Sequence, residues 1–110
     1  MELKVREQDT VTVISVSGSI DALTASELTD FADAQIEAGH NKLVIDLSQV
    51  EFMSSAGLRS FLGTMKNCRK DGGDMLLAAA QPGVEKVLKL SGFTEIIKMY
   101  PSLEDAAEFF

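Results

Sequence analysis

Two adjacent serines are the residues of this chain whose type and position best suit chemistry. Ser54 and Ser55 lie in EFMSSAGLRSFL (51–62), between an apolar run and a segment whose apolar residues have helical spacing. Serine is a preferred N-cap residue, so we expect at least one of the two hydroxyls to cap this helix. Ala56 and Gly57 leave the first helical turn with almost no side-chain bulk. Another protein can therefore approach the serines closely, and capping does not exclude that second role.

Two aspartates are the acidic candidates. Asp21 and Asp46 fall in different predicted elements, with no spacing that would align them for acid–base catalysis. Asp46 lies in the apolar run LVIDL (43–47), where a charge is costly unless it is near the strand end. We therefore place Asp46 at the carboxyl end of that strand, at the rim where open α/β sheets bind ligands. A purely structural hydrogen-bonding role for Asp46 stays open beside a functional one.

The single histidine and the single cysteine are predicted to have no catalytic role. His40 follows a predicted helix end and has no acid or nucleophile beside it, which indicates a surface residue near the helix dipole. Cys68 lies three positions after Met65, near an apolar helical stripe, which favours a partly buried structural thiol. With one cysteine, no internal disulfide forms.

Composition excludes several classes of function. The chain has 110 residues and a net charge of −7, which argues against binding to nucleic acid or to an anionic membrane. It contains no glycine-rich phosphate loop, no metal-ligand cluster and no nucleophile elbow, so we expect no enzyme and no cofactor. The N-terminus has no apolar signal core, and no run approaches the roughly 18 apolar residues of a membrane span. We therefore expect a cytoplasmic protein.

The elements that must position the serines alternate along the chain. Apolar periodicity and β-branched runs predict five strands, at 3–7, 10–17, 43–47, 75–79 and 95–100. Four helices are predicted: one begins at Thr24 and stops at Gly39, one follows the serines, one starts at Pro82 and stops at Ser91–Gly92, and the last is capped by Ser102. We expect loops at 18–21 and 48–55.

Several local expectations accompany these elements. Thr24 and Glu27 have capping-box spacing, and Leu23 and Leu28 have the spacing of a hydrophobic staple. In the strand at 10–17 the apolar residues change parity, which indicates either a bulge or burial on both faces. The inward residues of the later helices are predicted to be Val84, Val87 and Leu88, then Leu103, Ala106, Ala107 and Phe110.

The order β-β-α-β-α-β-α-β-α defines the fold class. Strands alternating with helices imply a mainly parallel sheet with right-handed crossovers. The first two strands are joined by a short turn, so they add an antiparallel edge. We predict a single-domain α/β protein with a mixed, mainly parallel sheet and four helices, which occupies residues 1–110.

Three segments resemble one known family. DLSQVEFMSSAGLRSFL (46–62) resembles the signature of the STAS domain, specifically that of bacterial anti-sigma factor antagonists. GSIDALTASEL (18–28) resembles the loop of that family that leads into the first helix, and LKLSGFTEIIKMYPSLEDAAE (88–108) resembles its C-terminal part. The resemblance covers nearly the whole chain in the right order, and the family's fold agrees with the element order predicted above.

The resemblance implies a regulatory function. Unphosphorylated proteins of this kind bind an anti-sigma factor that is also a serine kinase, and so release a sigma factor for transcription, as in stress responses. The kinase phosphorylates the motif serine with ATP, the complex dissociates, and a PP2C-type serine phosphatase restores the serine. By position the phosphorylated residue is Ser55, with Ser54 as a rival. The implied partner-binding surface consists of Asp21, Asp46, Met53, Ser54, Ser55, Ala56, Gly57 and Leu58.

Two other classes of function remain as alternatives. STAS domains also serve as accessory subunits of lipid-transport ABC systems and in stress-sensing assemblies, which commonly lack a phosphorylatable serine at the motif. A small flavodoxin-like enzyme or phosphocarrier would need a His or Cys in the loop after Leu47, and residues 48–55 contain neither. The intact SSAGL motif (54–58) favours the sigma-regulatory branch.

Overall fold

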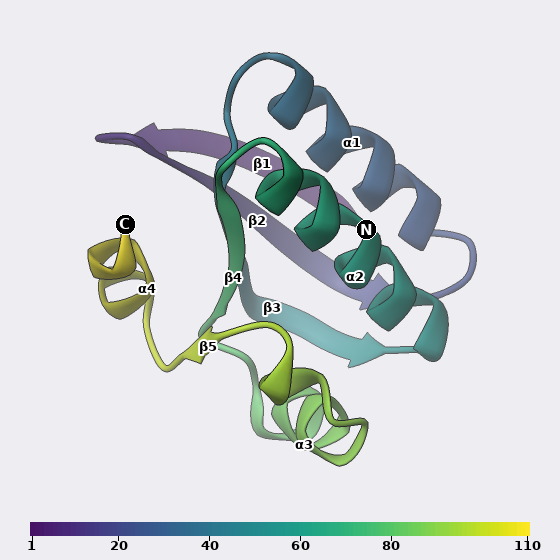
Figure 1. Cartoon of the computed structure of the whole chain (residues 1–110). Helices are drawn as coiled ribbons and strands as arrows, with labels where there is room; N and C mark the ends of the chain where they lie inside the picture. The colour runs from purple at the N-terminus through teal and green to yellow at the C-terminus, as the bar shows by residue number, and fades with distance from the viewer.

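A five-stranded sheet with helices on both faces forms the protein, as the computed structural model of residues 1–110 shows (Figure 1). The strands lie in the order β1-β2-β3-β4-β5, and only β1 is antiparallel to its neighbour. Their bounds are β1 Glu2–Gln8, β2 Val11–Ile20, β3 Lys42–Met53, β4 Asp74–Ala78 and β5 Met99–Tyr100. The helices are α1 Ala25–Glu37, α2 Ser55–Lys70, α3 Pro82–Leu90 and α4 Leu103–Phe109. The predicted fold class and element order are confirmed.

Two apolar clusters hold the layers together. The larger one joins one face of the sheet to α1, α2 and α3, and Phe61 of α2 is its bulkiest fully buried side chain. The smaller one lies on the opposite face, where Ala106 of α4 packs against β2, β3 and β4. α1 and α2 lie side by side over their face (Figure 1). Each apolar side chain removed from water contributes about 1.5–3 kcal/mol, so these clusters dominate the stability of the fold.

Burial on both faces explains the parity change in β2. Val11 and Val13 belong to the smaller cluster, whereas Ile14 and Val16 belong to the larger one. β2 itself carries no extra residue, so the alternative of a bulge in this strand is wrong. β2 also continues to Ile20, through most of the predicted loop at 18–21.

β3 is much longer than predicted, because two bulges disguise it in the sequence. The strand runs from Lys42 to Met53 and α2 begins at Ser55, so the predicted connection at 48–55 is wrong except for Ser54. Opposite β2, β3 has one extra residue between Asp46 and Gln49 and another between Val50 and Phe52. Each extra residue shifts the alternation by one position. The buried residues of this part of the strand are therefore spaced by two and then by three, at Ile45, Leu47, Val50 and Met53.

Asp46 lies in the middle of β3, not at its end. It pairs with Ser15 of β2 and with Ala78 of β4. One carboxylate oxygen accepts a hydrogen bond from the Ser15 hydroxyl (3.2 Å), and the other accepts one from the Ser48 backbone N–H (3.0 Å). The second contact satisfies a backbone N–H at the first bulge, and together the two give Asp46 a structural role. Seven residues of strand separate it from Ser54, a distance on the order of 25 Å.

The C-terminal region differs from prediction in two places. The predicted strand at 95–100 is instead a 3-10 turn at Phe93–Glu95 followed by the two-residue strand β5. Val87 is exposed, whereas Val84 and Leu88 face the core as predicted. The predicted cap of the last helix is confirmed, since the Ser102 hydroxyl accepts a hydrogen bond from the Asp105 N–H (3.1 Å).

Asp46→Ala tests the role of this carboxylate at the bulge. The substitution leaves the Ser48 N–H and the Ser15 hydroxyl without their acceptor, so we expect the free energy of unfolding to fall by about 1–2 kcal/mol. Urea denaturation followed by circular dichroism measures it. Ser15→Ala is the matched control, because it removes one of the two hydrogen bonds and should cost less. Equal stability of Asp46→Ala and the wild type would contradict this account.

Candidate functional site

The carboxyl ends of β2 and β3 bring two loops together. Ile20 and Met53 form the last pair of the parallel register, and the Ser54 N–H donates to the Ile20 carbonyl (2.8 Å). The loop that begins at Asp21 therefore lies beside the serines, and both α1 and α2 begin at this rim (Figure 1). Of the two predicted acidic neighbours of the serines, Asp21 lies at this rim and Asp46 does not.

Ser54 is the N-cap of α2. Its backbone is extended (φ −92°, ψ 172°), and its hydroxyl oxygen accepts a long hydrogen bond from the Gly57 N–H (3.4 Å). Its carbonyl accepts the first backbone hydrogen bond of the helix, from Leu58 (3.2 Å). The side chain is half-buried. The prediction that one of the serines caps the helix is confirmed.

Ser55 differs from its neighbour in every one of these respects. It is the first residue of α2, its side chain is exposed, and its hydroxyl takes part in no hydrogen bond. Its hydroxyl is thus free to react or to contact another molecule. α2 has no acidic residue in its first turn, so the free N–H groups there meet no side-chain charge from their own helix.

Three of the residues expected to contact a partner lie beneath the site. Met53 and Leu58 are 3% and 8% exposed, and Gly57 is buried as well. A Cβ on Gly57 would lie 2.7 Å from Ile20 Cγ2 and 3.1 Å from Met53 Cγ. The missing side chain therefore lets the first turn of α2 rest directly on the end of β2. Ala56 is half-buried beside them.

Asp21 organises the other loop of the rim. Its carboxylate accepts hydrogen bonds from the Thr24 N–H (3.1 Å) and the Leu23 N–H (2.9 Å), and these donors hold the pKa of Asp21 below its ordinary value of 3.8. The Thr24 hydroxyl accepts from the Asp21 N–H (2.9 Å) and donates to the Ser19 carbonyl (3.0 Å). The predicted capping box of Thr24 with Glu27 is wrong, because Asp21 takes over the hydrogen bonds of this turn.

Two apolar side chains near this rim are exposed, contrary to the pattern of the sequence. Leu23, the expected staple partner of Leu28, is instead 85% exposed, and Phe52 is 55% exposed. Phe52 pairs with Ser19 of β2, one position before the final pair of the register, and so lies close to Ser54. Because Phe52 follows a bulge, it does not fit the alternation of apolar and polar residues in a strand. The one sign of its exposure in the sequence is that it is a large apolar residue outside any period.

Other reactive side chains are engaged elsewhere. His40 Nδ1 lies 2.7 Å from a carboxylate oxygen of Glu7, which links the end of α1 to β1. Cys68 is fully buried, and loss of solvation raises the pKa of its thiol to about 12, with the charge of Asp74 as a further cause. It is a structural thiol, more deeply buried than predicted. No cluster of metal-ligating side chains is present, and no helix is both long and apolar enough to cross a membrane.

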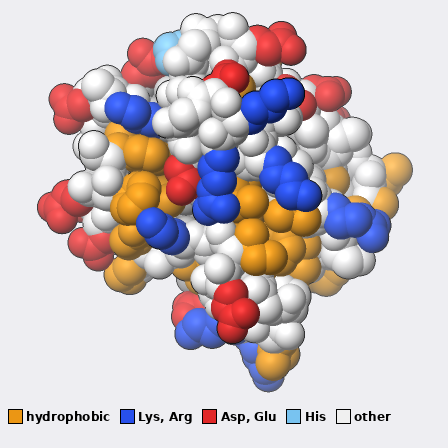
Figure 2. All heavy atoms as spheres, in the orientation of Figure 1, with side chains coloured by type: hydrophobic (Ala, Val, Ile, Leu, Met, Phe, Trp, Pro, Cys, Tyr) orange, Lys and Arg blue, Asp and Glu red, His pale blue; other side chains and the backbone are white.

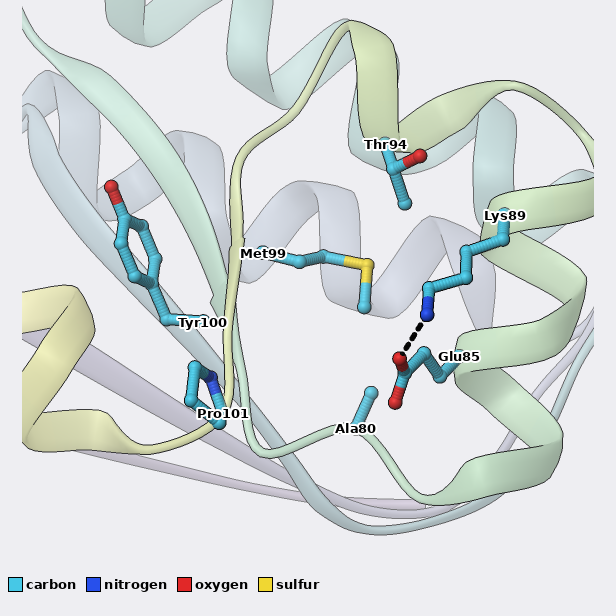
Figure 3. Close-up of a pocket in the computed structure, with 7 residues that line it drawn as sticks. All are labelled: Ala80, Glu85, Lys89, Thr94, Met99, Tyr100 and Pro101. Carbon is cyan, nitrogen blue, oxygen red and sulfur yellow. Dashed lines mark ion pairs between the residues drawn. The ribbon is translucent and has the colours of Figure 1, made fainter.

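A hollow of about 350 Å³ lies between α3 and β5 (Figure 3), and neither serine lines it. Met99, Tyr100 and Ala80 line it together with an ion pair between Glu85 and Lys89 (2.6 Å). These two charges satisfy each other, and none of the predicted site residues lines the hollow.

Comparison with known proteins identifies the family. The model of the STAS domain matches residues 2–106. The putative anti-sigma factor antagonist BtrV of Bordetella bronchiseptica is 32% identical over 110 residues, which cover all of this chain and 95% of the relative. The anti-sigma-B factor antagonist of Listeria monocytogenes is 30% identical over 100 residues, covering 90% of this chain and 86% of the relative.

A solved structure agrees with both. The crystal structure of an anti-sigma factor antagonist from Mycobacterium paratuberculosis superimposes with a TM-score of 0.88 at 36% identity, covering 97% of this chain and 91% of that one. The chain belongs to the STAS domain family.

Gly57→Ala tests the close approach between α2 and β2. The added methyl group meets the buried Ile20 side chain, so we expect the free energy of unfolding to fall by about 1–3 kcal/mol. Gly63→Ala is the matched control in the same helix, because nothing lies within 4 Å of the added Cβ. That control should gain about 1 kcal/mol from helix propensity. Stabilisation of both variants in thermal unfolding would show that Gly57 is not under packing constraint.

Asp21→Asn tests the charged turn at the rim. Asparagine keeps an acceptor oxygen but does not titrate. Because folding lowers the pKa of Asp21, its ionised form stabilises the fold fully above pH 3.8, and this contribution is lost as the pH falls through the folded-state value. We therefore expect the wild type to be more stable than Asp21→Asn at neutral pH, with a gap that closes in acid. Chemical denaturation across this range measures it, and a gap independent of pH would contradict the assignment.

Proposed function

We propose that this protein is an anti-sigma factor antagonist that acts by partner switching. In its unphosphorylated form it binds an anti-sigma factor that is also a serine kinase, and so releases a sigma factor for transcription. Phosphorylation of Ser55 abolishes this binding, and a PP2C-type phosphatase restores it. The protein itself needs no catalytic activity or cofactor in this scheme, and all steps take place in the cytoplasm. The names of its relatives, anti-sigma factor antagonists at 30–36% identity, support the class.

The observation that carries the proposal is the difference between the two serines. Ser55 is exposed and its hydroxyl is free, whereas the Ser54 hydroxyl accepts a hydrogen bond within the helix cap. A kinase needs an accessible hydroxyl that can enter its active site, and Ser55 meets this requirement. Ser54 remains the rival, because a 3.4 Å hydrogen bond is weak enough to break.

A phosphate on Ser55 is compatible with the fold. It adds about −1.5 to −2 charges at the N-terminus of α2, where free N–H groups and the helix dipole favour an anion. The exposed side chain leaves the group in water, so no desolvation cost arises in the isolated protein.

The same phosphate is incompatible with a close interface. A partner packed on Ser55 would remove the dianion from water beside Asp21 and Glu51, the two carboxylates of the adjoining loop and bulge. Asp46, the other aspartate of the partner-binding surface that the resemblance implies, lies farther along β3 and does not take part in this repulsion. Phosphorylation therefore releases the partner without unfolding the domain. The exposed side chains of Leu23 and Phe52 supply apolar contact area that such a partner can cover.

Affinity capture with Ser55 variants tests the proposal. Wild type and Ser55→Ala should recover an anti-sigma factor with serine kinase activity, and phosphate should map to Ser55 in the wild type only. Ser55→Asp should bind this partner about tenfold or more weakly, with an unchanged melting temperature. Thr10→Asp is the control, because it adds the same charge in the exposed turn at the opposite end of β2.

Three outcomes would contradict the proposal. One is loss of stability in Ser55→Asp with affinity retained. Another is phosphate on Ser54 in the wild type. The third is recovery of lipid-transport ABC subunits with no phosphate, which would establish the alternative role of an accessory subunit.

A further inference from the structure

Charge is distributed unevenly between α1 and α2, which pack side by side. α2 contains four of the ten Lys and Arg residues of this acidic chain and no Asp or Glu. α1, which packs beside it, has the opposite composition, with Glu27, Asp30, Asp33 and Glu37 and no Lys or Arg. Several Lys and Arg side chains lie across the face that α2 turns to the viewer in Figure 2.

Three of the four cations on α2 are unpaired. Arg69 binds Asp74 (3.0 Å) and also donates to the Ile96 carbonyl (3.0 Å), so it is engaged within the fold. Arg59, Lys66 and Lys70 are exposed and have no carboxylate within 4.0 Å. Asp33 of α1 accepts a hydrogen bond from the Asn67 amide of α2 (3.1 Å) and forms no ion pair. These charges contribute little to stability and are available to another molecule.

The unpaired cations form one line with the reactive serine. Successive helix residues are rotated by about 100°, so Arg59, Lys66 and Lys70 fall within about 40° of one another, and Ser55 extends the same line. At a rise of 1.5 Å per residue the line is about 22 Å long. We call these four residues the α2 stripe. It begins at the rim described above and is continuous with it.

The carboxylates of α1 limit what the α2 stripe can bind. A lipid bilayer or a nucleic-acid duplex presents anions over a broad surface, which would also approach Glu27, Asp30 and Glu37 on the neighbouring helix. The stripe instead fits a narrow row of negative charge, such as acidic side chains along one helix or one extended segment of a protein.

We propose that the α2 stripe is a docking surface for a partner protein that presents a row of carboxylates. The inference rests on the proposed function in one respect, since the partner is the one released by phosphorylation of Ser55. It also supplies a further physical reason for the release. Phosphoserine lies one helical turn before Arg59, the spacing at which side chains of opposite charge attract, so it withdraws Arg59 from the partner. The dianion also faces the partner's own carboxylates.

A defined peptide tests the docking surface without knowledge of the natural partner. The probe is a helical peptide with glutamates at the spacing of Arg59, Lys66 and Lys70, and a glutamine version is the reference. In amide chemical-shift titration at low salt, the acidic peptide should perturb the exposed face of α2. Arg59→Glu/Lys66→Glu should weaken its binding about tenfold. The matched control, Arg6→Glu/Lys86→Glu, changes the net charge equally at exposed, unpaired residues of β1 and α3 and should bind normally.

Several outcomes would overturn the inference. Two concern the peptide: chemical-shift changes that do not map to α2, and equal weakening of binding by Arg6→Glu/Lys86→Glu. A third is that the peptide does not bind while anionic phosphatidylserine vesicles bind through the α2 stripe. The fourth is self-association of the protein that Arg59→Glu/Lys66→Glu abolishes. A second arm uses the purified partner recovered with the wild type. If Ser55→Asp abolishes binding of that partner but Arg59→Glu/Lys66→Glu does not, the docking surface fails and the proposed function stands. If Ser55→Asp leaves binding intact while the peptide result holds, the proposed function fails alone.

Discussion

The parallel pairing of β2 with β3 is the contact on which the rest of the site depends. It runs from Thr12 and Leu43 to Ile20 and Met53, and it continues beyond the end of β4. Because this pairing extends beyond the last residue of β4, the rim with the serines lies beyond the end of β4. The last hydrogen bond of this pair, from Ser54 to Ile20, fixes where α2 begins. Gly57 then permits the helix to settle on Ile20 without a gap.

Much of the fold can be predicted from the sequence, because most elements keep their own period. The apolar residues Leu58, Phe61 and Met65 have helical spacing, which predicts the buried face of α2, and all three are buried. The bulges in β3 break the period of two, and no local signal in the residues at 48–53 reveals that they pair with β2. The prediction of β5 is wrong for a related reason, since a strand of two residues is too short to show a period.

The candidate site could be located from the sequence but not resolved into its parts. Composition makes Ser54 and Ser55 equivalent, and only the helix start separates a capping hydroxyl from a free one. Likewise, the family motif does not separate residues that contact a partner from residues that support the site, and it includes the buried Met53 and Leu58. The predicted capping box of α1 is wrong because Asp21 accepts a hydrogen bond from the Thr24 N–H and donates its own N–H to the Thr24 hydroxyl. Helix propensities do not weigh such a contact, three residues apart in a turn, against a capping box.

The charges around Ser55 provide a physical reason why the proposed phosphorylation would act on a complex without acting on the fold. In the free protein, an exposed phosphate at the N-terminus of α2 meets backbone N–H groups and water, and both favour it. In the proposed complex, the same charge would be desolvated between Asp21 and the carboxylates of a partner held by the α2 stripe, and neither neighbour would favour it. The free energy of the modification thus differs between the bound and free states, and this difference is what shifts the equilibrium. A partner attracted by charge is also more sensitive to salt than one held by apolar contact alone. In the proposed complex, the exposed Leu23 and Phe52 would supply the affinity that remains when ions screen the α2 stripe.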